Sequence, residues 1–192
     1  MVGQDGLKEL DKSLEIVVLV VFATGRNAVW TRWGLDHQVQ RRLQDVDQCL
    51  HLFGKPAEVS ATGFVDLAKG IDSITAELHY AAIGSVIVTG GWHHPGSYPF
   101  AMEYTVVCDG GTLEYSLAGG GPVLYGVDGT KTVLPLQERD GYEAEVAYFV
   151  ECCVSGRKPE RCPPEESAAA VKLMRLIVEA REKKGEKIPC NL

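Results

Sequence analysis

The sequence lacks an apolar run long enough to cross a membrane. Its longest candidate is the segment 16–23, whereas a spanning helix needs about 20 residues. A signal peptide carries net positive charge before its apolar stretch, but this run is preceded by the acids Asp5, Glu9, Asp11 and Glu15. The run is rich in valine and ends at a glycine turn, so we expect a buried strand and no membrane partner.

Positive charge is also scarce. Lys and Arg together number 19 against 26 Asp and Glu, which gives a formal net charge of −7. Binding to nucleic acid or to anionic lipid depends on clustered basic residues. The only such clusters, Arg41-Arg42 and Lys183-Lys184, are short and lie among acidic or polar residues. We therefore expect no nucleic-acid partner.

Metal-binding and disulfide patterns are missing as well. The six cysteines form no CxxC pair and no Cys/His spacing typical of zinc. Cys152 and Cys153 are neighbours in a predicted helix, where they point in different directions, and a chain of 192 residues can form a core without disulfides. We expect reduced thiols in a cytoplasmic protein and no metal site.

The sequence contains no GxGxxG turn after a strand, the pattern that binds the pyrophosphate of a dinucleotide within a βαβ unit. The run Gly119-Gly120-Gly121 lies between predicted strands, and we interpret it as a flexible turn. We therefore expect no cofactor site in this chain.

What is present is the composition of one globular domain, with 45% hydrophobic and 23% charged residues. Apolar residues spaced by three and four predict helices at 7–14, 45–53, 142–155 and 165–184. Short apolar runs between glycine and aspartate turns predict strands at 15–23, 58–62, 73–80, 83–90, 98–108, 111–117, 123–127 and 131–136. Asp109-Gly110 is a strong hairpin signal. The pattern predicts an α+β fold with a mainly antiparallel open sheet and helices on one face.

Four stretches, in the same order and with the same spacing, resemble the carboxyl-terminal domain of the Gfo/Idh/MocA oxidoreductases, the glucose-fructose oxidoreductase and inositol dehydrogenase family. They are the segment DVDQCLHLFGKP at 45–56, the strand ending in Gly91-Trp92, the hairpin DGGTLEY at 109–115, and the helical region 142–185 with Phe149, Gly156 and Pro159. The resemblance implies a Gfo/Idh/MocA-like domain at 45–192. The segment 1–44 then reads as a divergent or truncated remnant.

In that family a separate Rossmann domain binds NAD or NADP, and the carboxyl-terminal domain supplies the substrate pocket and an open sheet for oligomer contacts. This sequence departs from the family's catalytic pattern. The Glu-Lys-Pro tripeptide does not occur, and the positions of the family's Asp and His, counted back from Asp45, are Gln40 and Gln44. A second register makes Asp36 the family Asp and Gln40 the His, with His37 one residue away as a displaced candidate. Asp36 and His37 are therefore the catalytic candidates.

The family's substrate-facing strands end near Trp92, His93 and His94, which makes these three residues candidates for sugar contact. Adjacent histidines on a strand point to opposite faces, which disfavours metal binding. Core or surface packing is the alternative for all three. For His79, within a strand, we favour a structural use.

The residues leave three hypotheses open. The chain is a substrate-binding and oligomerisation domain related to NAD(P)-dependent sugar or polyol oxidoreductases, inactive alone. Alternatively it is a subunit that completes the pocket of a separate Rossmann-domain chain, or a non-catalytic self-association module. In each case we expect a homo-oligomer formed through the sheet face opposite the helices, because runs such as 83–88 and 104–107 are apolar at both alternating sets. Val86 and Val106 are the residues we expect in that contact.

Overall fold

In the computed structural model, the structure describes residues 17–23, 43–64, 73–91, 97–99, 101–136, 139–161 and 163–192, and for 17–23, 43–44 and 118 the backbone alone. The described helices are α3 (Leu43–Phe53), α4 (Gly141–Ser155) and α5 (Pro164–Glu182), with a short 3-10 turn η1 (Leu117–Gly119). The strands are β1 (Val17–Ala23), β2 (Glu58–Phe64), β3 (Ser73–His79), β4 (Ser85–Gly91), β5 (Ala101–Cys108), β6 (Gly111–Ser116), β7 (Val123–Gly126), β8 (Lys131–Val133) and β9 (Ile188–Pro189).

These strands form one sheet in the order β8-β7-β6-β5-β1-β4-β3-β2-β9. Strand β1 pairs in parallel with β4, and the other pairings are antiparallel. The predicted α+β fold with a mainly antiparallel sheet is confirmed. The predicted helix at 7–14 lies outside the described residues. Residues 17–23 share one sheet with the rest of the chain, and a division into 1–44 and 45–192 stays a prediction.

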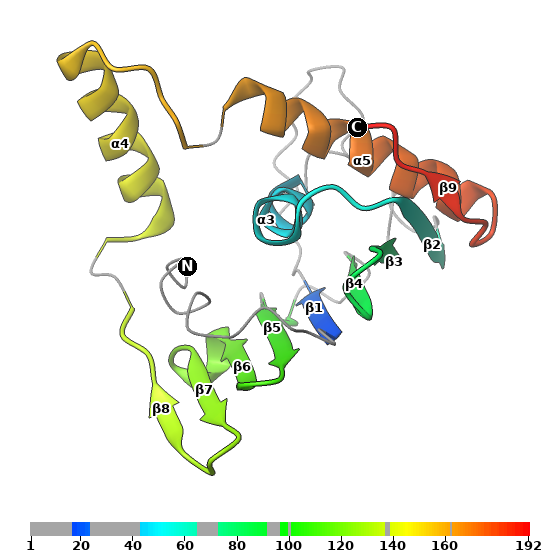
Figure 1. The fold of residues 1–192 in the computed structure, drawn as a ribbon, viewed down its shortest axis with the longest axis horizontal. Coiled ribbons are helices and arrows are strands. Elements are labelled where there is room, and N and C mark those ends of the chain that lie inside the picture. Colours follow the sequence, from blue (N-terminus) through cyan, green and yellow to red (C-terminus); the bar gives the residue numbers. More distant parts are fainter. Residues whose placement is uncertain are drawn as a thin grey trace.

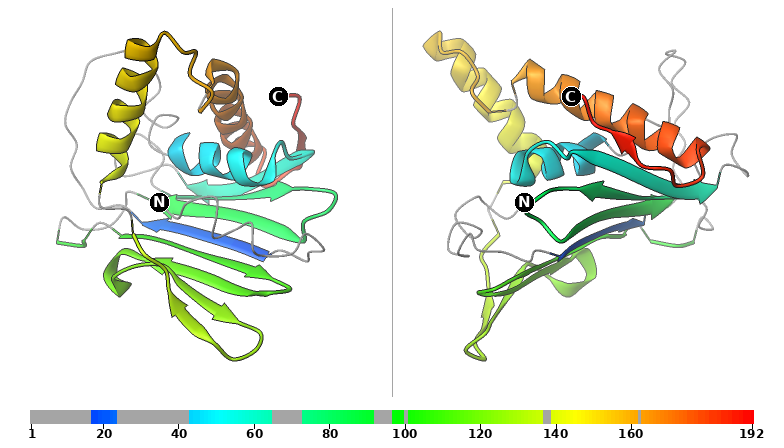
Figure 2. Two further views of the ribbon diagram at one scale, coloured as in Figure 1. Left: turned by 60° about the vertical axis from the view of Figure 1, so that its left-hand side comes forward. Right: turned by 45° about the vertical axis from the view of Figure 1, so that its right-hand side comes forward.

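The core lies where α3 and α5 cover one face of the sheet (Figures 1 and 2). Alternate residues of the strands point toward these helices and are buried, namely Val59 and Ala61 of β2, Ile74, Ala76 and Leu78 of β3, and Val86 and Val88 of β4. The helices contribute Val46 and Cys49 of α3 and Leu173, Met174 and Ile177 of α5. Burial of these side chains is the main stabilising term of the fold.

The hairpin predicted at Asp109-Gly110 joins β5 and β6, with Cys108 paired to Gly111. Gly111 has φ 152°, and a Cβ atom there would clash with the carbonyl oxygen of Tyr125 on the next strand. Only glycine therefore fits this position, which accounts for its place in the DGGTLEY segment.

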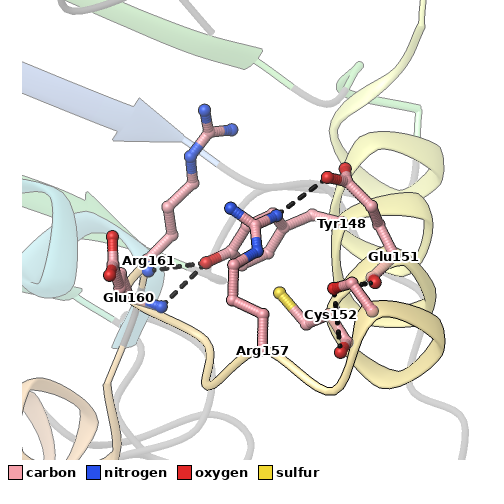
Figure 3. A network of polar contacts seen from close by, with 7 residues as sticks. Tyr148, Glu151, Cys152, Arg157, Glu160 and Arg161 are labelled. Atoms are coloured by element: carbon pink, nitrogen blue, oxygen red, sulfur yellow. Dashed lines mark hydrogen bonds and ion pairs between the residues drawn. The ribbon is translucent and has the colours of Figure 1, made fainter.

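Helix α4 differs from the expectation that its apolar stripe covers the sheet. Val146, Phe149 and Val150 are 63%, 59% and 52% exposed, and α4 stands away from the sheet in Figure 1. The helix instead turns its other side to the segment that follows it. Cys152 is buried there, and the hydroxyl of Tyr148 accepts backbone hydrogen bonds from Glu160 and Arg161 (Figure 3). These contacts fix the rotation of α4 and leave its stripe facing outward.

Candidate functional site

The carboxyl ends of the two parallel strands, β1 and β4, lie together at one edge of the sheet. The register pairs Ala23, the last residue of β1, with Gly91, the last residue of β4. Ala101 at the start of β5 pairs with Ala23, and Ser73 at the start of β3 pairs with Gly91. In open α/β sheets, ligands bind outside the carboxyl ends of the parallel strands, and β1 and β4 form a parallel pair of this kind. This edge is therefore the candidate site.

The site residues predicted from the sequence belong to the segments that come after β1 and β4 in the chain. Trp92, His93 and His94 come directly after Gly91, and Asp36 and His37 belong to the segment that connects Ala23 to α3. All five lie outside the described residues, so their roles stay predictions. Both segments start at the same edge of the sheet, because Ala23 and Gly91, which precede them, are paired.

A stacked tyrosine pair, which sequence reasoning missed, lies on the helix side of the sheet beyond α3 and α5. The rings of Tyr104 in β5 and Tyr115 in β6 are 5.2 Å apart, centre to centre, with an interplanar angle of 24°. Burial, and then the neighbouring Tyr115, raises the pKa of Tyr104 to about 12. The Tyr104 hydroxyl is therefore neutral at physiological pH and can donate or accept a hydrogen bond to a sugar hydroxyl. A two-residue turn at Asp109-Gly110 sets this pairing, and that signal was present in the sequence.

The opposite face of β2, β3 and β4 carries a polar ladder. His79 Nε2 lies 2.9 Å from Ser60 Oγ, its Nδ1 lies 3.9 Å from Glu77 Oε1, and Ser85 donates to the same carboxylate oxygen at 3.2 Å. Thr75 and Thr89 share a hydroxyl contact of 2.8 Å across β3 and β4. His79 thus contacts Ser60 on the neighbouring strand β2 and Glu77 on its own strand, and the structural use favoured for it stays a prediction.

Helix α3 carries the segment DVDQCLHLF. Burial, and then the charge of Glu166, raises the pKa of Asp47, while His51 lowers it. Burial raises the pKa of Cys49 to about 12, so this thiol stays protonated and unreactive at neutral pH. Asp47 is a titratable group of α3, and Cys49 belongs to the core.

The starts of α4 and α5 do not fit the pyrophosphate of a dinucleotide cofactor. The start of α4 is already capped, because Asp140 Oδ1 accepts the Glu143 N–H at 2.8 Å. The start of α5 consists of Pro164, Glu165 and Glu166, which lacks one N–H donor and carries two carboxylates that repel a phosphate. Among the described residues, no group of three or more His, Cys, Asp or Glu is placed to hold a metal ion.

Comparison with solved structures identifies the architecture. The yvaA protein of Bacillus subtilis superposes with a TM-score of 0.72 at 21% identity, over 97% of this chain and 60% of its own. The dehydrogenase MviM of Clostridium difficile gives 0.70 at 16% identity, over 92% and 57%. The UDP-N-acetylglucosamine 3-dehydrogenase GnnA of Acidithiobacillus ferrooxidans gives 0.69 at 16% identity, over 86% and 53%.

The chain shares the fold of a part of each of these three proteins. At these identities the likeness establishes the fold alone, and it confirms at that level the resemblance to the Gfo/Idh/MocA proteins. The chain spans 53% to 60% of the length of these three proteins. No family model and no curated protein matches the sequence. None of the helices in the described part of the chain is both long and apolar enough to span a membrane.

Proposed function

We propose that this chain is the substrate-binding and self-association domain of a sugar or polyol oxidoreductase that uses NAD or NADP, and that it is catalytically inactive alone. The observation that carries the proposal is the coverage. Nearly the whole chain, 97%, has the fold of a protein of which it spans only 60%. The absence of a GxGxxG turn from the residues 1–192 and the poor fit of a pyrophosphate to the starts of α4 and α5 support the proposal that the hydride carrier is not bound by these residues.

The substrate class follows from the chemistry at the candidate edge. The imidazole and indole groups of His93 and Trp92, which follow Gly91 in the chain, are suited to hydrogen-bonding and stacking on an uncharged polyol, as is the hydroxyl of Tyr104, which lies further along β5. GnnA, which shares the fold, is a dehydrogenase of a nucleotide sugar. A sugar or polyol is therefore the ligand that we propose for this edge.

Loss of catalysis follows from the residues at the family's His position. In both registers of the resemblance this position is a glutamine, which cannot exchange a proton at neutral pH. General acid or base catalysis contributes about 100-fold to 10,000-fold in rate. Asp36 and His37 are the remaining candidates, and any turnover would depend on them.

We propose that the protein is cytoplasmic, because the described cysteines are free thiols.

Self-association is proposed through the sheet face opposite α3 and α5. Here the structure corrects the choice of contact residues. Val86 and Val106 are 0% and 4% exposed on the helix-covered face, because strand alternation turns them toward the core. Their neighbours Ile87 and Val107 point to the other face, where Val107 is 40% exposed. The register pairs both with β1 at the centre of the sheet, so this apolar centre is the surface for a second copy.

Ligand-observed NMR with myo-inositol, glucose and UDP-N-acetylglucosamine tests the substrate proposal. We expect saturable binding of at least one compound by the isolated chain, weakened ten-fold or more by Trp92→Ala with His93→Ala and by Tyr104→Phe. Tyr125→Phe is the matched control, because Tyr125 is exposed on the opposite face and its hydroxyl donates to Glu114. Absence of binding for all three compounds would contradict the proposal. Fluorescence titration should show no NADH binding, and saturation at micromolar NADH would reveal a cofactor site in this chain.

Sedimentation at micromolar concentration tests the self-association. We expect a dimer or larger oligomer that dissociates in Ile87→Lys with Val107→Lys. Val127→Lys should leave it intact, because Val127 lies 78% exposed in the turn between β7 and β8. A monomeric wild-type chain would contradict the proposed self-association but not the proposed sugar binding.

A further inference from the structure

Arg181 is a charged residue in the buried stripe of α5. It follows Met174 and Ile177 at helical spacing, and these two side chains are 0% and 2% exposed in the core between α5 and the sheet. Arg181 itself is only 9% exposed, and it is the one charged side chain that is buried among the described residues. Since charged side chains are almost never buried unless they are paired, this position requires a counter-charge.

Part of the guanidinium group has no partner. Its Nη1 atom is closed off from solvent and has no hydrogen-bond acceptor within the part of the chain that the structure describes. The helix dipole favours a cation in the last turn of α5, but it requires neither the burial nor the unused donor. A water molecule would accept the hydrogen bond and leave the charge unbalanced, whereas an oxyanion supplies both the acceptor and the opposite charge.

The end of α5 that carries Arg181 lies against the carboxyl-terminal half of β2. A Cβ atom on Gly185 would lie 3.3 Å from Thr62 Cγ2, and Arg181 precedes Gly185 by one helical turn, about 6 Å along the axis. Figure 2 shows this end of the helix beside the tip of β2. Arg181 therefore belongs to the part of α5 that is nearest to the end of β2.

The end of β2 lies at the candidate edge. Phe64 pairs with Ser73, Ser73 with Gly91, and Gly91 with Ala23, so these residues form one row across β2, β3, β4 and β1. Neighbouring strands are about 4.8 Å apart, which places β2 about 10 Å from β4 along the row. The substrate candidates follow the end of β4, and Arg181 belongs to the helix end at β2. A ligand that reaches both must extend along this row.

We propose that Arg181 binds an anionic group of the substrate, and that the substrate is therefore a sugar or polyol with a phosphate or carboxylate group. The inference rests on the proposed function and deepens it, because the uncharged hydroxyl groups lie at the candidate edge after β4 and the anionic group lies at the end of α5. The planar guanidinium offers parallel N–H donors to two oxygens of either group. Phosphate and carboxylate share this chemistry, so the two groups are tested side by side.

Thermal unfolding of Arg181→Met tests whether the guanidinium is unpaired in the free chain. An apolar side chain of similar volume in place of an unpaired buried charge is expected to be neutral or stabilising. In chloride buffer the variant should therefore unfold at the temperature of the wild-type chain or above it. A midpoint more than about 4 °C lower would mean that the chain itself pairs Arg181, and this result would overturn the inference.

Phosphate and acetate, each compared with chloride at equal ionic strength, test the binding of an oxyanion. The unfolding midpoint of the wild type should rise and saturate in at least one of them, because a ligand that binds only the folded state stabilises it. Arg181→Met should lose this rise. Arg175→Met, which changes an exposed arginine on the same helix, is the matched control and should keep it. Equal responses of all three proteins would leave only a general salt effect and reject the site.

Isothermal titration calorimetry with glucose, glucose 6-phosphate and glucuronate tests the substrate class. We expect one of the two anionic compounds to bind at least about ten-fold more tightly than glucose, the effect of one charge-assisted hydrogen bond. Arg181→Met should abolish this advantage and leave the affinity for glucose unchanged. Arg181→Lys should keep part of it, because the charge remains and the planar fork is lost. Equal affinity of the wild-type chain for all three compounds would reject the anionic substrate.

The anion site and the proposed function fail separately in these experiments. Glucose binding without a response to phosphate or acetate that depends on Arg181 would reject the anion site and leave the sugar-binding proposal in place. A response that depends on Arg181, without binding of any of the sugars, would support the anion site and contradict the proposed sugar substrate.

Discussion

The two halves of the sheet are built differently. In the half formed by β2, β3 and β4, alternate strand residues meet α3 and α5, and side chains such as Leu78 and Leu173 are 0% exposed. In the half formed by β5 to β8, large apolar residues including Val127 and Val133 remain 78% and 66% exposed, and α4 stands apart. The first half holds the fold together. The second half leaves more of its surface open, and the tyrosine pair is found there.

The difference in stability between the two halves is tested most directly by truncating a buried side chain in one half and an exposed side chain in the other. Leu173→Ala on α5 should lower the free energy of unfolding by about 2–5 kcal/mol, because it leaves a cavity between helix and sheet. Val133→Ala on β8 should change it by less than about 0.5 kcal/mol, because that side chain is already in water. Urea denaturation followed by circular dichroism measures both. Equal losses would show that the second half carries as much of the stability as the first.

A smaller effect is expected where α4 is anchored. Tyr148→Phe removes the oxygen that accepts the N–H groups of Glu160 and Arg161, at a cost of about 1 kcal/mol in local stability. Hydrogen exchange should accelerate about five-fold at these two amides, while amides of β3 are unchanged. Tyr142→Phe, whose ring is 73% exposed, is the control. Acceleration across the whole sheet would mean that α4 is part of the main cooperative unit.

The smallest effect is confined to alkaline pH. The folded-state pKa of Tyr104 is about 12, above its ordinary value of 10.0, so the unfolded chain loses this proton first. The resulting stability is fully present below pH 10.0 and is lost as the pH rises toward about 12. Tyr104→Phe should therefore flatten the decline of stability in this window, measured by urea denaturation at a series of pH values. Tyr125→Phe should not, and an equal change in both variants would refute the assignment to Tyr104.

Local patterns in the sequence predicted most of the elements. The spacing of apolar residues located α3, α4 and α5, and the turn at Asp109-Gly110 located the hairpin of β5 and β6, because both signals depend on neighbours along the chain. The two-residue strand β9 was missed, since Ile188 and Pro189 are too few to show alternation. These are limits of local information.

The rest depended on contacts between distant residues. Alternation in β4 separates Val86 from Ile87, but only the position of α5 decides which of them is core. An apolar stripe likewise predicts that a helix is amphipathic without saying what covers it, and the contacts of Tyr148 turned the stripe of α4 away from the sheet. The predicted residues Asp36, His37, Trp92, His93 and His94 lie outside the described part of the chain. For them the structure supplies only the shared edge from which their segments start.

The central place of β1 has a consequence for how the chain folds during synthesis. Its partners are residues 85–91 of β4 and 101–107 of β5, which leave the ribosome long after it does. Until then the valine-rich strand has no sheet to join, and β4 and β5 have open edges where it should lie. Pairings between such distant segments form slowly, and unpaired apolar strands are prone to aggregation while they wait. β1, which is translated before the other described strands, is thus the one whose insertion completes the sheet. A β1 contributed by another copy of the chain could fill the same gap by domain swapping.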